Sequence, residues 1–165
     1  MIQASKADVK ADFDRYVARA TTLIHAPETT GAVQNMLAGP DPVSKIAAAT
    51  VMIMQRLDAA ARAQKIEVQD TIKTFAAVEI IGMIEELGVA SGKFAKLSKE
   101  LHELAVSVAV QDYVKGEVKA GRIDAKRLQV QMDADMRKLP AKQRKEIQDS
   151  QIRIQMTARK YNGGK

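Results

Sequence analysis

The chain has 165 residues, a length that fits one domain or one domain with an appendage. It has no cysteine and two histidines, which excludes disulfides, thiol catalysis, cysteine-ligated metals and most histidine-rich metal sites. The net charge is +6 and is unevenly distributed. Residues 1–121 hold 14 Lys and Arg against 15 Asp and Glu, whereas residues 122–165 hold 12 Lys and Arg against 5 Asp and Glu. The excess of positive charge therefore lies in residues 122–165.

The N-terminal part of the chain predicts three helices. The first covers residues 5–24. This N-terminal stretch lacks the apolar segment of a secretion signal, so we expect the protein to be made and used in the cytoplasm. A short helix follows at residues 30–37. The third covers residues 42–65, with Asp41 as its N-cap and Pro42 at its first helical position.

The predicted helix at residues 42–65 has the most regular apolar pattern of the chain. Its apolar positions recur at alternating spacings of three and four, which is the heptad pattern of a coiled-coil-like packing face. Alanines beside this seam would let another helix approach closely. The seam residues are Val43, Ile46, Ile53 and Leu57.

The stretch FAAVEIIGMIEEL, residues 75–87, lies in a fourth predicted helix and is the most continuously apolar run. Its apolar residues cover nearly half of the helix circumference, which is typical of a core helix wrapped by neighbours. Three glutamates interrupt it, and a bilayer span needs about 20 apolar residues, which excludes a transmembrane helix. We expect this helix to end at Gly88.

Carboxylates and histidines in this region do not form a recognisable catalytic or metal site. A four-helix carboxylate site needs Glu-x-x-His on two helices, whereas His102 is the one histidine of the region and follows Glu100 by two positions. We therefore expect no enzyme activity, no metal and no cofactor. His102 is interpreted as a surface residue and His25 as a partner of the dipole at the C-terminus of a helix. The glutamates are interpreted as a solvated or salt-bridged edge: Glu79, Glu85, Glu86, Glu100 and Glu103.

The rest of the chain predicts a fifth helix from about residue 94 to Gly121, and two more in residues 122–165. Residues 103–110 also alternate with the period of a strand, but without partner strands we interpret them as buried helix. The fold class is therefore all-α. We divide the chain into a bundle of about five helices, the body (residues 1–121), and a basic, glutamine-rich helical extension for docking, the arm (residues 122–165).

The arm carries the candidate binding residues. Lys and Arg at this density could neutralise the phosphates of DNA or RNA, bind an acidic protein surface, or form a solvated face. A membrane surface is the least favoured partner, because apolar residues after position 140 are sparse and lack Trp or Phe. The candidate residues are Arg122, Lys126, Arg127, Arg137, Lys138, Lys142, Arg144, Lys145, Arg153, Arg159 and Lys160.

Two stretches carry a family resemblance, KIAAATVMIMQRLDAAARAQ and RLQVQMDADMRKLPAKQRKEIQDSQIRIQ. In a cysteine-free, tryptophan-free chain with a basic tail, they resemble small α-helical virion proteins of tailed bacteriophages, of the internal, ejected or neck-associated kind. The likeness is one of general style over the whole chain and assigns no role to any residue. It implies a non-enzymatic subunit, present in the virion and connected with DNA ejection, that packs against copies of itself or larger virion proteins.

Two hypotheses of function follow from these patterns. The first is a structural or assembly subunit, a homo-oligomer or a component of a virion, that docks through its arm. The alternative is a nucleic-acid-associated protein that binds phosphates through the basic helices of the arm.

Overall fold

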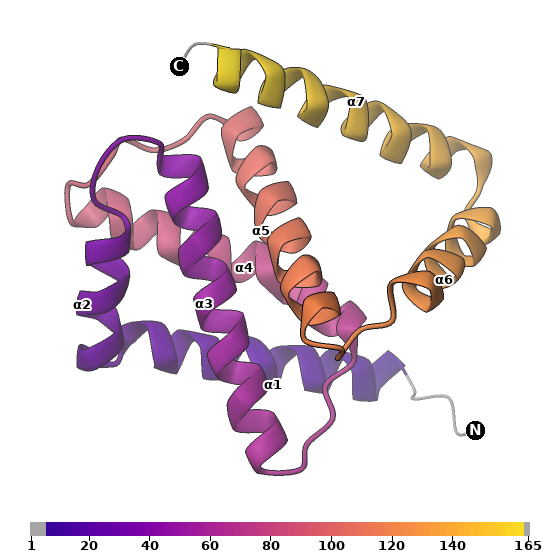
Figure 1. Cartoon of the computed structure of the whole chain (residues 1–165), viewed down its shortest axis with the longest axis horizontal. Coiled ribbons are helices and arrows are strands. Elements are labelled where there is room, and N and C mark those ends of the chain that lie inside the picture. The colour runs from indigo at the N-terminus through magenta and orange to yellow at the C-terminus, as the bar shows by residue number, and fades with distance from the viewer. Residues whose placement is uncertain (1–5, 164–165) are drawn as a thin grey trace.

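A computed structural model describes residues 6–163 of the chain, and Figure 1 shows them as helices joined by short connections. No strand occurs among these residues, which confirms the all-α class, and residues 103–110 are helical. The helices are α1 (Lys6–His25), α2 (Pro27–Met36), α3 (Pro42–Ala63), α4 (Asp70–Ala90), α5 (Lys99–Lys119), α6 (Ala125–Lys138) and α7 (Ala141–Gly163).

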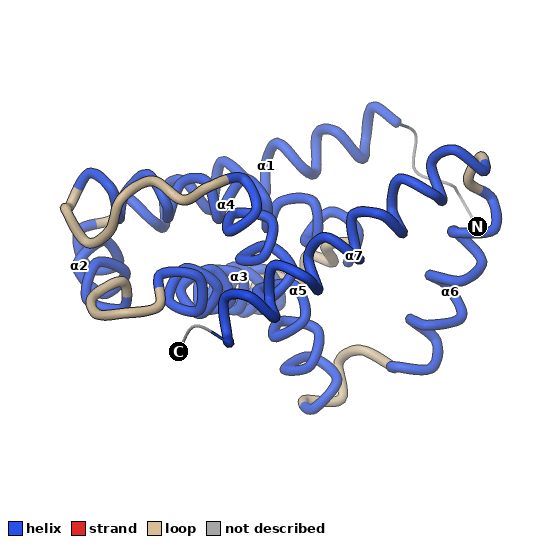
Figure 2. The backbone as a smooth tube through the Cα atoms, turned by 90° about the horizontal axis from the view of Figure 1, so that it is seen from above, coloured by secondary structure: helices blue, strands red, loops and turns tan. Residues whose placement is uncertain are grey.

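The body is built from two pairs of helices that cross each other. α1 packs along α4, and α3 packs along α5, while α3 also contacts α4 and α1 (Figures 1 and 2). α2 closes one end by contacting α1, α3 and α4. The arm leaves the body after α5, and α7 then returns across α5 (Figure 1).

α3 and α4 are the two central helices, because each of them contacts the other four of the helices α1 to α5. Many of the apolar side chains of α4 are buried, and burial of such surface stabilises the fold by about 25 cal/mol per Å². The exceptions are Phe75, Val78 and Val89, with 66%, 42% and 40% of their surfaces exposed. The buried residues of α4 include Ile72, Ala76, Ala77, Ile80, Ile81 and Ile84.

The start of α3 follows directly from its sequence. Asp41 is the N-cap, where its Oδ1 accepts a hydrogen bond from the Ser44 backbone N–H at 3.2 Å, and Pro42 occupies the first turn. Asp41 adopts a left-handed backbone conformation with φ of 70°, which Asp tolerates better than most residues.

The predicted end of α4 at Gly88 is wrong. The helix continues to Ala90, and the glycine with positive φ that follows it is Gly92 (φ +68°). Gly88 lies inside the helix, where a Cβ would be 2.2 Å from Cζ of Phe94. The glycine is therefore needed because the Phe94 ring packs on the helix backbone.

The start of α5 also differs from the prediction, because Ser98 caps the helix through the Leu101 N–H.

Replacing Gly88 with Ala should destabilise the protein by about 1–3 kcal/mol, because the new methyl group overlaps the Phe94 ring. Gly82 is the matched control, since it lies in the same helix and a Cβ there would meet nothing within 4 Å. Gly82→Ala should raise the unfolding free energy by about 0.5–1 kcal/mol through helix propensity. Urea unfolding measures both, and equal effects of the two substitutions would contradict the contact with Phe94.

Candidate functional site

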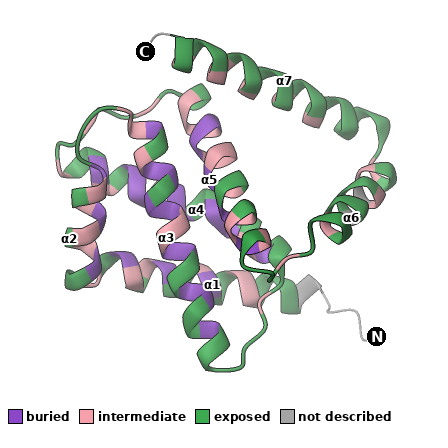
Figure 3. Cartoon of the chain, in the orientation of Figure 1, coloured by how far each residue is buried: buried purple, intermediate pink, exposed green. Residues whose placement is uncertain are grey.

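The eleven basic residues predicted to bind a partner all have exposed side chains. Ten of them lie on α6 and α7, and none of the described side chains of these two helices is buried (Figure 3). α6 carries Lys126 and Arg127 at its start, and Arg137 and Lys138 at its end. α7 carries the remaining six, which are Lys142, Arg144, Lys145, Arg153, Arg159 and Lys160. The arm thus presents its cations to solvent.

Arg122, in the turn before α6, forms an ion pair within the chain. Its Nε donates to Oε2 of Glu117 at 2.7 Å, and its Nη2 donates to Oε1 at 2.8 Å. Glu117 is 2% exposed, and the hydrogen bonds from Arg122 hold the pKa of its carboxyl below the ordinary value. Arg122 therefore joins the end of α5 to the turn before α6. Its guanidinium forms these hydrogen bonds within the chain.

α6 has an apolar stripe that no other helix of the described chain packs along. Leu128, Met132 and Met136 recur at a spacing of four, so they lie on one side of the helix. Met132 is 53% exposed. Apolar surface of this kind is typical of a helix that contacts a partner.

α7 is attached to the body by its C-terminal half. Ile154, Ala158 and Tyr161 are partly buried and pack against the hydrophobic core. The Tyr161 hydroxyl donates to Oδ1 of Asp41 at 2.7 Å. Burial, followed by this hydrogen bond and the charge of Asp41, raises the pKa of Tyr161 to about 12. The end of the arm is thus held against the N-terminus of α3.

The four residues of the predicted packing seam, Val43, Ile46, Ile53 and Leu57, are all buried in the body. They belong to one hydrophobic core, and the neighbours of α3 are α1, α2, α4 and α5. The seam is therefore occupied by helices of the same chain.

Glu85 was expected on a solvated edge and is instead buried, with 7% of its surface exposed. Its Oε1 accepts from the Leu97 backbone N–H at 3.0 Å, and its Oε2 lies 2.8 Å from Nδ1 of His102. His102 is therefore half-buried, and the pair anchors the loop between α4 and α5. Glu79 and Glu86 are exposed, and His25 is exposed at the end of α1. Among the described side chains, no three His, Cys, Asp or Glu gather as metal ligands would.

A buried polar cluster around Asp58 was missed by sequence reasoning. Asp58 is 2% exposed, and it accepts hydrogen bonds from the hydroxyls of Tyr16, at 3.3 Å, and Tyr113. Nζ of Lys73 lies 3.5 Å from Oδ2 of the same carboxylate. Burial, followed by the contact with Asp58, raises the pKa of both phenols. One carboxylate thus connects α1, α3, α4 and α5.

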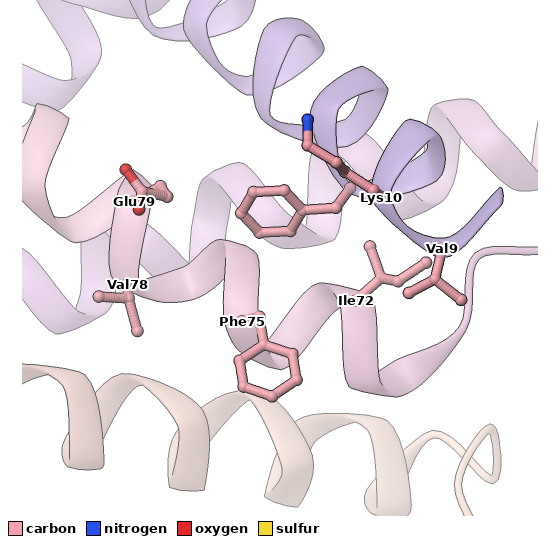
Figure 4. Close-up of a pocket in the computed structure, with 7 residues that line it drawn as sticks. Val9, Lys10, Ile72, Phe75, Val78 and Glu79 are labelled. Carbon is pink, nitrogen blue, oxygen red and sulfur yellow. The ribbon is translucent and has the colours of Figure 1, made fainter. Parts of the chain in front are cut away.

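An open apolar groove of about 500 Å³ lies between α1 and α4 (Figure 4). Val9 and Phe13 line it from α1, and Ile72, Phe75 and Val78 line it from α4. Lys10 and Glu79 are its charged members. All of these residues belong to the body, so the groove is formed without the arm.

Comparison with protein-family models, with curated proteins and with solved structures gave no match to this chain. Function is therefore inferred from its own residues. Among the described residues, no helix combines the length and the apolar character that crossing a bilayer requires.

Asp58→Ala should destabilise the protein by about 3 kcal/mol. The substitution leaves two buried hydroxyls without their acceptor and removes a buried charge partner of Lys73. Asp70→Ala is the control, since it removes the other carboxylate near Lys73 (3.2 Å), whose side chain is 54% exposed. It should cost about 1 kcal/mol or less. Urea unfolding compares the two, and a cost for Asp58→Ala no larger than the control would show that the cluster does not stabilise the fold.

Arg122→Gln should lower the unfolding free energy at neutral pH, because Glu117 loses its ion pair. The pKa of Glu117 is lowered in the folded state, so this contribution is present above the ordinary pKa of 4.5 and is lost as the pH falls through the folded pKa. The deficit of the variant should therefore shrink as the pH falls below the ordinary pKa of 4.5 and through the lowered pKa of the folded state.

Lys119→Gln removes the same charge from an exposed position at the end of α5, three residues before Arg122, and serves as the control. Unfolding curves of both variants across this pH range make the comparison. A deficit of Arg122→Gln that does not change with pH would rule out the assigned role of the pair.

Proposed function

We propose that this chain is a non-enzymatic assembly subunit whose arm docks onto a partner protein. The observation that carries the proposal is α6, which lies outside the packed helices of the body and presents an apolar stripe flanked by exposed cations. A helix with these properties fits a contact in which the stripe is buried and the cations meet an acidic rim.

The partner class comes from the resemblance to small virion proteins of tailed bacteriophages. On this proposal the chain packs against copies of itself or against a larger virion protein, in a particle that ejects DNA. The body supports such a role because its core is closed by its own helices, so it can act as a stable platform for the arm.

A nucleic-acid-associated protein is the second candidate, supported by the ten exposed cations of α6 and α7. Binding would depend on phosphate contacts and not on base stacking, because the aromatic side chain of the arm, Tyr161, is partly buried and bonded to Asp41. Such binding would be insensitive to sequence and strongly dependent on salt.

The assembly proposal is tested with the native particle and with the proteins encoded beside this chain. Quantitative mass spectrometry should find the chain at a fixed copy number in purified particles, and it should remain after a high-salt wash. A chain that is absent from particles and binds none of the neighbouring gene products would overturn the proposal.

A charge variant of α7 separates the two candidates. Lys142, Arg144 and Lys145 are exposed, and their joint replacement with Gln should weaken duplex DNA binding and reduce the salt slope by about 0.9 for each phosphate that is no longer neutralised. The control replaces Lys93, Lys96 and Lys99, which are exposed on the body and carry the same charge.

Fluorescence anisotropy titrations across salt concentrations measure these slopes. Equal slopes for the wild type and the α7 variant would exclude phosphate binding by this part of the arm. Equally weakened binding by the two triple variants would show that net charge alone, and not the arm, governs binding.

A further inference from the structure

α7 packs on the body with one side and exposes apolar side chains on the other. Ile154, Ala158 and Tyr161 pack against the hydrophobic core, and α5 is the helix that α7 crosses. Positions two residues before and after Ile154 lie about 160° away around the helix, on the side turned away from α5 (Figure 3). These positions hold Ile152 and Met156, with 55% and 54% of their surfaces exposed. We call this side the outer face of α7.

Cations lie before and after the apolar pair on the outer face of α7. Lys145 and Arg159 are each seven positions from Ile152, which is nearly two full turns, so the three side chains lie almost on one line. Lys142 and Lys160 lie beside this line, and all four cations are exposed. From Lys142 to Lys160 the face is about 27 Å long.

The charges of the outer face have no partner in the described part of the chain. None of the four cations forms a salt bridge or a side-chain hydrogen bond with another described residue. Asp149 lies on the same face, seven positions before Met156, and is also exposed and without such a partner. The face therefore presents charges of both signs around an apolar centre.

This mixed pattern favours a protein segment over phosphates or a lipid surface. The phosphates of a nucleic acid, or anionic lipid headgroups, would match the cations but repel Asp149. Phosphates also leave Ile152 and Met156 uncovered, and two aliphatic side chains are a small apolar area for anchoring a helix in a bilayer. A protein surface supplies carboxylates, apolar side chains and a cation together.

We propose that the outer face of α7 binds an acidic amphipathic helix of a partner protein. Apolar side chains in the middle of that helix cover Ile152 and Met156. Carboxylates in its two end turns meet the cations of α7, and one basic side chain between them meets Asp149. A helix of about 18 residues matches the length of the face. The inference rests on the proposed assembly function and names the chemistry of the partner.

The apolar pair and the charges have different tasks in this contact. Covering Ile152 and Met156 removes apolar surface from water and favours binding. Methionine suits such a contact because its flexible side chain adapts to irregular surfaces. Exposed ion pairs add little affinity, but they exclude partners of the wrong charge and speed association at low salt. Apolar substitutions should therefore change affinity, and charge reversals should change the choice of partner.

Two synthetic helical peptides test the surface with the full-length chain. The acidic peptide has about 18 residues, with glutamates in its end turns, leucines along the middle of one side and one lysine beside them. The basic peptide exchanges every glutamate for lysine and the lysine for glutamate. Fluorescence anisotropy should show saturable binding of the acidic peptide, and binding of the basic peptide at least about tenfold weaker.

Ile152→Asp should raise the dissociation constant of the acidic peptide about tenfold or more, because it places a carboxylate in the covered contact. Val130→Asp is the matched control, since it makes a similar change at a position of α6 that is 69% exposed. It should change the dissociation constant less than about twofold. Circular dichroism checks that both variants fold.

The double variant Lys145→Glu, Arg159→Glu should reverse the preference and bind the basic peptide more tightly than the acidic one. The control double variant Lys93→Glu, Lys96→Glu has the same net charge, with both changes at exposed positions of the body, and should keep the preference for the acidic peptide.

Several results would overturn the proposal. They are a lack of saturable binding of the acidic peptide, equal dissociation constants for Ile152→Asp and Val130→Asp, and an unchanged preference in the Lys145→Glu, Arg159→Glu variant. Duplex DNA and phosphatidylglycerol vesicles are titrated in parallel. Binding of either one more tightly than the acidic peptide, with the same loss on Ile152→Asp, would assign the face to phosphates.

The proposed function is tested separately with the neighbouring gene products. A chain that is present in particles and binds such a product equally well with and without Ile152→Asp would overturn the role of the outer face and leave the assembly function standing.

Discussion

The fold depends on a buried carboxylate that must be neutralised from several directions at once. An ionised Asp in a protein interior is costly unless hydrogen-bond donors or cations surround it. Asp58 on α3 finds two phenols and an ammonium, one each from α1, α5 and α4. Because these donors come from different helices, the contacts of Asp58 are made only when α1, α4 and α5 are all in place around α3. Apolar packing stabilises the contacts between the helices, and the polar contacts of Asp58 favour one arrangement of these helices.

The same side of α5 also binds Arg122, the first residue of the arm. Tyr113 and Glu117 are one helical turn apart and both buried, so the face that meets Asp58 continues into the face that binds Arg122. The guanidinium then fixes the first residue after the turn at Gly121, which has φ of +70°. The direction in which α6 leaves the body is therefore set by a polar contact that begins in the core.

Features governed by neighbours in sequence were predictable, and features governed by distant partners were not. The all-α class and the Asp41–Pro42 start of α3 follow from local patterns, as does the exposure of the arm cations. The Gly88 contact and the Arg122 pair depend on where later residues return in space. A signal for the buried carboxylates was nevertheless present. Glu117 continues a buried line at a spacing of four, after Ala105, Ala109 and Tyr113.

The oxygen that receives Tyr161 also caps α3, and this has a consequence for how the chain can change. Asp41 keeps its two bonds from Ser44 whether or not the tyrosine is present, so release of α7 leaves the α3 cap intact. A single hydrogen bond from a neutral donor contributes about 0.5–1.5 kcal/mol to stability. A hydrogen bond to a charged acceptor contributes somewhat more. Substitutions on the exposed surface of α6 and α7 can therefore change that surface while the body stays folded, because the residues that hold the core together are largely different ones.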